Sequence, residues 1–137
     1  MKHCVNYQIG DWIIIEGDPV QVAAIHQKKV GYHKWPGRLS WVRLDQIQTI
    51  PLTPDFLIKN GFTKIRDGCY EWKRVAGDGF FFITLEDRFD GIWDMTVENY
   101  DRLSNNQSRK EVTGRFLRVH QIQHEFVSEG IKKEFVV

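Results

Sequence analysis

Short apolar runs divided by turn-forming residues fill the first fifty positions, and this pattern constrains the fold more than any other feature. β-Branched and aromatic residues make up the runs, while Gly, Asp and Pro stand between them. The former suit a pleated strand and the latter suit reversals of the chain. The pattern predicts five strands, at residues 13–16, 20–25, 29–33, 39–43 and 47–50. Five short strands with tight turns are typical of a small SH3-like barrel, and an open curled sheet is the alternative.

The remaining sequence predicts two helices and an antiparallel meander. Thr53 suits a helix N-cap, Pro54 the first helical position and Gly61 the C-terminal stop, so a two-turn helix is expected between them. Apolar residues at helical spacing predict a final amphipathic helix over residues 119–129. Alternating apolar and polar residues predict strands at 62–65, 69–75, 80–86 and 92–98. Residues 99–114 lack any periodicity and are expected to form a mobile loop.

These elements together predict an α+β fold that is rich in strands. The chain has 137 residues, of which 42% are hydrophobic, and this is the size and composition of one domain with a single core. We expect one compact unit over residues 1–137. Within it, residues 1–51 would form the SH3-like barrel, and residues 52–137 would form the antiparallel sheet and the final helix.

Hydropathy and cysteine usage point to the cytoplasm. No apolar run approaches the roughly 18 to 20 residues of a membrane-spanning helix, and the first residues lack the apolar stretch of a signal peptide. Cys4 and Cys69 are the only cysteines, too few for a disulfide framework and without the CxxC spacing of zinc sites. We therefore expect a cytoplasmic protein with two reduced thiols, no cofactor and no membrane contact.

Charge is unevenly distributed along a chain whose formal net charge is only +1. Residues 19–44 contain no Asp or Glu but five Lys and Arg residues, and aromatic residues lie between these cations. The candidate binding residues are Lys28, Lys29, Tyr32, His33, Lys34, Trp35, Arg38 and Trp41. Cations neutralise phosphates and flat rings stack on bases, so this region could bind nucleic acid, but it could equally bind a protein. The structural alternative places Tyr32 and Trp41 in the core and the lysines in solvent.

Two further arrangements of side chains could form binding sites. Trp12, Tyr32, Trp35 and Trp41 could line an aromatic groove for an extended peptide or a methylated cation. His120 and His124 are four residues apart on the predicted final helix, a spacing that can bind a divalent metal. The neighbouring sequence lacks the Glu of a metalloprotease helix, so an exposed polar flank is the favoured interpretation of this pair.

No catalytic motif is evident in the sequence. Neither cysteine lies in the context of a known nucleophile, and none of the serines lies in an elbow motif. We therefore expect a protein that is not an enzyme, with a metal-dependent enzyme centred on His120 and His124 as a remote alternative.

Three segments of the chain resemble a known set of proteins. They are residues 9–12, residues 47–62 and residues 119–123, and the most specific part is Ile-Pro-Leu-Thr-Pro at 50–54 followed by Asn-Gly-Phe at 60–62. In these segments the chain resembles small uncharacterised proteins of Bacteroides-type bacteria and of their prophages and mobile elements. That set has no assigned activity, so the resemblance implies a bacterial or phage accessory protein and no site residue. Together these inferences favour a non-catalytic interaction module for a protein partner, with nucleic-acid binding as the alternative.

Overall fold

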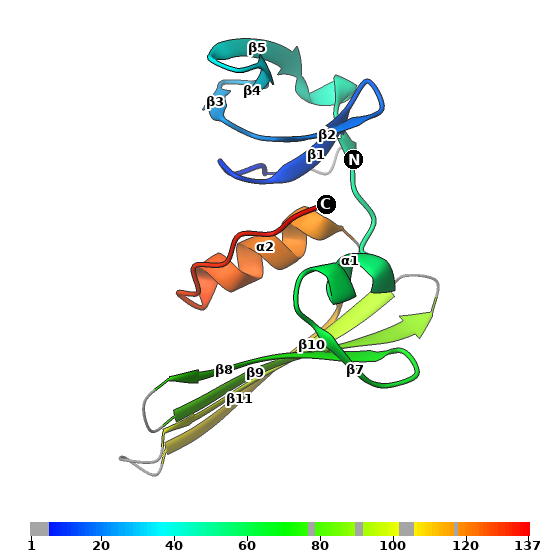
Figure 1. Cartoon of the computed structure of the whole chain (residues 1–137), viewed down its shortest axis with the longest axis vertical. Coiled ribbons are helices and arrows are strands. Elements are labelled where there is room, and N and C mark those ends of the chain that lie inside the picture. Colours follow the sequence, from blue (N-terminus) through cyan, green and yellow to red (C-terminus); the bar gives the residue numbers. More distant parts are fainter. Residues whose placement is uncertain (1–5, 77–78, 90–91, 102–105, 117) are drawn as a thin grey trace. The chain divides into compact units, whose positions relative to one another are not determined.

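The computed structural model describes residues 6–76, 79–89, 92–101, 106–116 and 118–137. These residues form two compact units (Figure 1), the first containing residues 1–50, 118–135 and 137 and the second containing residues 51–117 and 136. The described residues form three antiparallel sheets and two α-helices. The prediction of a strand-rich α+β fold is therefore confirmed. No closed barrel was found among the described strands.

The first unit contains two three-stranded sheets joined by one bent strand. The first sheet has the order β2-β1-β6 and the second the order β3-β4-β5. The strands are β1 (Trp12–Ile15), β2 (Asp18–Gln21), β3 (Ala24–His26), β4 (Lys29–Trp35), β5 (Arg38–Arg43) and β6 (Gln48–Thr49), with a short 3-10 helix, η1 (Leu44–Gln46), after β5. The backbone N–H of Val22 donates to the Asp11 carbonyl, and that of Ala23 donates to the Gly31 carbonyl. Strand pairing therefore continues almost without a break from β2, which pairs with β1, to β3, which pairs with β4, and the chain bends between them. Such a bend lets one strand contribute to two sheets.

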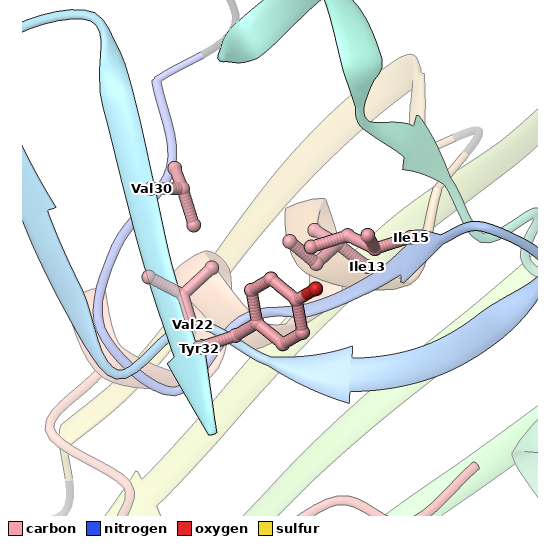
Figure 2. Close-up of a cluster of buried hydrophobic side chains, with 5 residues drawn as sticks. All are labelled: Ile13, Ile15, Val22, Val30 and Tyr32. Atoms are coloured by element: carbon pink, nitrogen blue, oxygen red, sulfur yellow. The ribbon is translucent and has the colours of Figure 1, made fainter. Parts of the chain in front are cut away.

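An apolar core fills the space between these two sheets. Figure 2 shows Ile13 and Ile15 from β1, Val30 and Tyr32 from β4, and Val22 from the bend gathered in one cluster. Because successive side chains of a strand point to opposite faces, Ile13 and Ile15 share the inner face of β1, and Val30 and Tyr32 share that of β4. The same alternation turns Lys29, Gly31 and His33 to the outer face of β4.

Helix α2 (Val119–Ser128) completes the first unit. It starts at the residue after Arg118, whose N–H donates to the side chain of Gln121, in agreement with the predicted start at residue 119. Phe126 of the helix packs edge-on against Phe135 at a ring distance of 5.0 Å. The side chain of Gln123 accepts a hydrogen bond from the backbone N–H of Trp12 and donates one to the Gly10 carbonyl. These two bonds join the helix directly to β1 and to the turn before it.

The second unit is a five-stranded antiparallel meander with a short helix. Its strands are β7 (Thr63–Arg66), β8 (Cys69–Ala76), β9 (Gly79–Phe89), β10 (Ile92–Asp101) and β11 (Asn106–Phe116), and they pair in the order β11-β10-β9-β8-β7. Helix α1 (Pro54–Lys59) precedes them, with the Thr53 side chain accepting from the Phe56 N–H as the predicted N-cap. Buried side chains of β9 and β10, among them Leu85 and Met95, form the core with Trp93.

Two sequence predictions for this unit need correction or qualification. Residues 99–114 are not simply a loop, because β10 continues to Asp101 and β11 occupies most of the remainder. The periodicity is missing because β11 is an edge strand with mainly polar side chains on both faces. Cys4, predicted to be a reduced thiol, lies outside the described residues, while Cys69 is a buried free thiol.

Among the described residues, no helix is both long and apolar enough to cross a lipid bilayer.

Candidate functional site

The outer face of the β3-β4-β5 sheet, together with the two ends of its strands, carries most of the predicted binding residues. Strand register fixes three rows across it: His26, Lys29 and Arg43 in the first, Ala24, Gly31 and Trp41 in the second, and His33 with Leu39 in the third. Lys28 precedes the first row. Lys34, Trp35 and Arg38 lie at the opposite end beside the β4-β5 turn, where a register shift between His33 and Trp35 turns Trp35 and its partner Arg38 to the face opposite to Leu39 and Trp41. We call this set of residues the basic aromatic surface.

Large apolar side chains are exposed together on this surface. Trp35 is 61% exposed, Trp41 45% and Leu39 39%. The ring of His26 lies edge-on to that of Trp41, with 6.5 Å between their centroids. Single exposed apolar residues are common, but a cluster of them on one sheet is typical of a contact surface.

Gly31 allows close packing at the centre of the surface. A Cβ atom placed on Gly31 would lie 3.3 Å from Ala24 Cβ and 3.3 Å from both terminal carbons of Leu39. Leu39 therefore leans over the bare backbone of β4, and Leu39, Ala24 and Trp41 form one continuous apolar area. Glycine within a strand commonly permits such a close approach.

The charges around this apolar area are positive at both ends of the sheet. Lys29 and Arg43 lie opposite each other in the first row, and Lys34 and Arg38 lie near the turn. Arg43 forms an ion pair with Asp45 at 3.3 Å, between side chains that are both well exposed. Exposed pairs of this kind contribute little energy, so Arg43 can exchange this partner for another anion.

Two of the predicted aromatic residues do not belong to the surface. Tyr32 is buried in the core of the first unit, as the structural alternative expected for this ring. Trp12 lies on β1, where its indole N–H donates to the Phe135 carbonyl at 2.7 Å. The four rings proposed for an aromatic groove thus lie in different environments: Tyr32 shares a sheet with Trp35 and Trp41 but is buried in the core, and Trp12 lies on another sheet.

Sequence analysis omitted five members of the surface from the candidate binding residues, namely Ala24, His26, Gly31, Leu39 and Arg43. The alternation of inward and outward side chains along β4 and β5 could have identified the outward-facing residues. Val30 and Tyr32 are the apolar residues of β4 with period two, so their neighbours must face outward together with the residues of β5 that pair with them.

His120 and His124 do not form the exposed flank that their spacing suggested. His120 is only 6% exposed, and its ring lies 5.4 Å from Tyr7 and 5.5 Å from His124. Nε2 of His124 lies 2.7 Å from the buried carboxylate of Asp11, which also accepts the N–H of Gln8. This flank of α2 faces the turn before β1, so both histidines pack against that turn.

Burial shifts the pKa values of His120 and of its neighbour Tyr7. It lowers the pKa of His120, an effect that the Asp11 carboxylate partly offsets and that His124 and Arg118 reinforce. Burial, and then the charge of Asp11, raises the pKa of Tyr7. Across the described residues, no three His, Cys, Asp or Glu side chains are grouped so that they could hold a metal ion.

Comparison of the chain with family models, curated proteins and solved structures gave no match.

Proposed function

We propose that the protein is a non-catalytic interaction module that binds a protein partner through the basic aromatic surface. The observation that carries this proposal is the exposure of Leu39 and Trp41 together on one face, and of Trp35 at the adjoining turn, in a sheet whose sequence, residues 19–44, contains no acidic residue. Protein interfaces are enriched in exposed aromatic residues and arginine, which supply most of the binding energy at their centres.

The proposal includes an SH3-like arrangement of residues 12–49. It is supported by the order of strand pairing. Strand β6 pairs with β1, β1 pairs with the β2 part of the bent strand, the β3 part of that strand pairs with β4, and β4 pairs with β5. The 3-10 helix η1 returns the chain from β5 to β6, which pairs with the first strand of the unit. Small folds of this kind commonly present a sheet face to an extended peptide.

The resemblance to small proteins of Bacteroides-type bacteria and their mobile elements supports a narrower role. An accessory protein of a phage or mobile element would act in the cytoplasm by binding a host or phage protein.

Affinity capture from the source cell, followed by mass spectrometry, tests the proposal. The wild-type chain should retain a specific partner that the double variant Trp35→Ala, Lys34→Ala loses, because both side chains lie at the exposed end of the surface. The matched control is Val75→Ser with Lys73→Ala, which removes an exposed apolar residue and an exposed lysine from β8. Capture of the same partners by all three proteins would contradict the proposal.

Nucleic-acid binding is a second candidate because Lys28, Lys29, Lys34 and Arg38 could neutralise phosphates while Trp35 stacks on a base. Binding of this kind weakens steeply as salt rises, since each neutralised phosphate releases counterions. A salt titration with single- and double-stranded oligonucleotides should then give a linear loss of log affinity with log salt. Absence of binding at low salt would exclude this candidate.

A further inference from the structure

We infer that Tyr7 is a pH-sensitive cover over His120, closed while the imidazole is neutral and open once it is protonated. The moving part is the segment of residues 6–9, which carries Tyr7 and precedes the turn before β1. This cover would act independently of the basic aromatic surface, because its residues lie on α2 and in the chain before β1. It would therefore be a regulatory device in addition to the proposed binding function.

His120 has no place for a second ring proton in the closed structure. The residue is 6% exposed, and its Nδ1 atom is buried without a hydrogen-bond partner among the described residues. A neutral imidazole leaves one ring nitrogen unprotonated, so Nδ1 can remain a bare acceptor, whereas the charged ring carries an N–H group on both nitrogens. Protonation in the closed structure therefore buries an N–H group that has no acceptor, and such a group is costly.

The charged groups around His120 do not offset this cost. Asp11 attracts a charge on His120, but its carboxylate already lies 2.7 Å from Nε2 of His124 and accepts the N–H of Gln8. His124, whose ring centroid is 5.5 Å from that of His120, and Arg118 oppose the charge. Burial therefore outweighs Asp11 and lowers the pKa of His120. Nε2 of His124 can donate to Asp11 whether or not its ring is charged, so this contact does not depend on the charge of His124.

Tyr7 covers the His120 ring from a segment that can move. The two ring centroids are 5.4 Å apart. Residues 6–9 lie outside the strands and helices, and Ile9 is 71% exposed. The Gly10 N–H donates to the Val22 carbonyl at 2.7 Å and anchors the chain directly after this segment. Gly10 has a φ of 96°, which glycine adopts without a steric penalty, so Gly10 can serve as the hinge.

Opening of the cover and protonation of His120 favour each other, because opening lets water reach Nδ1. A proton that binds the open form more tightly than the closed form shifts the population towards the open form. Each pH unit by which the two affinities differ changes the ratio of open to closed molecules by about tenfold at acid pH. Residues 6–9 should therefore detach between neutral and mildly acidic pH, while the strands of the first unit stay paired.

Nuclear magnetic resonance of the full chain between about pH 7.5 and about pH 5.5 tests the cover in the range where histidine titrates. The ring signals of Tyr7 and the amide signal of Gln8 should move towards those of an unstructured chain, with the same midpoint as the ring signals of His120. The amide signals of Ile13 and Val30 should keep their positions, because these residues lie in paired strands. Unchanged Tyr7 signals, or loss of the strand signals in the same transition, would overturn the inference.

Two variants separate a moving cover from a merely buried histidine. His120→Phe keeps a ring against Tyr7 but cannot gain a proton, so the acid transition of Tyr7 should disappear, whereas the exposed variant His33→Gln should retain it. Tyr7→Ala removes the cover, so the titration midpoint of His120 should rise towards its ordinary value of about 6.5. A Tyr7 transition that persists in His120→Phe, or a His120 midpoint that Tyr7→Ala leaves unchanged, would contradict the inference.

Discussion

His120 occupies a position that suits a neutral imidazole better than a charged one. Its Nδ1 atom is buried and has no hydrogen-bond partner among the described residues. Tyr7 and His124 contact its ring, and the groups that act on its charge are Asp11, which favours it, and His124 and Arg118, which oppose it. Burial outweighs the attraction of Asp11, so the pKa of His120 lies below its ordinary value.

We predict that acidification destabilises the protein in part through His120. In the unfolded chain this side chain has its ordinary pKa of about 6.5, so below that pH the unfolded chain binds a proton that the folded chain binds less readily. The stability that the neutral side chain of His120 contributes to the folded protein is therefore fully present above about pH 6.5, and it is lost as the pH falls below that value towards the lower pKa of the folded state. Urea unfolding from about pH 7.5 to about pH 5.5 should show a smaller loss of stability in His120→Phe than in the wild type.

The exposed histidine His33 supplies the control for this experiment. His33→Gln should retain the wild-type dependence on pH, because the side chain lies in solvent on the outer face of β4. An identical dependence in His120→Phe and in the wild type would show that His120 has no part in it.

Side chains close both ends of helix α1. Thr53 accepts the Phe56 N–H at the start, and at the end the buried amide of Asn60 donates to the Phe56 carbonyl and to the Val136 carbonyl. The Asn60 side-chain oxygen also accepts the Val136 N–H at 2.7 Å. One asparagine thus satisfies polar groups of two chain segments that are far apart in sequence.

We expect Asn60→Ala to destabilise the protein by about 1–3 kcal/mol, since the substitution leaves buried carbonyl and N–H groups without this partner. Guanidinium unfolding followed by circular dichroism measures the change. Ile58→Ser, at an exposed position of the same helix, is the control and should have a much smaller effect. A loss in Asn60→Ala no larger than that of the control would show that these hydrogen bonds contribute little.

The elements that sequence analysis predicted are those with strong periodicity or capping. Helix α2 begins at residue 119 as expected, because its apolar residues repeat at helical spacing. Strand β11 was missed because an edge strand with polar residues on both faces has no such signal. Tyr32 was assigned to the binding residues from its type alone, although its spacing of two from Val30 indicated the core. The contact of His124 with Asp11 depends on how α2 packs against the turn before β1, and no local pattern contains that information.

The two units of the molecule are connected in a way that suggests insertion. Residues 51–117 leave and re-enter the first unit at adjacent points, because the Val119 N–H donates to the Ile50 carbonyl at 2.8 Å. A segment that departs and returns at neighbouring points can be replaced without changing the strand pairing of the rest.

We therefore predict that a short Gly-Ser linker in place of residues 51–117 leaves the first unit folded. Circular dichroism and the fluorescence of Trp12, Trp35 and Trp41 would follow the shortened chain, which should unfold cooperatively. The full chain with Ile13→Ala is the comparison, since loss of this core residue should cost about 2–5 kcal/mol. A shortened chain without a cooperative transition would contradict the prediction.

The basic aromatic surface is the central claim at the scale of the whole molecule, and the five tryptophans of the chain report on it separately. Nuclear magnetic resonance of the indole N–H groups, before and after addition of the captured partner, is the most direct test. The account predicts that the signals of Trp35 and Trp41 shift, while those of Trp72 and Trp93 in the second unit do not. Shifts at Trp72 or Trp93 with no change at Trp35 and Trp41 would contradict it.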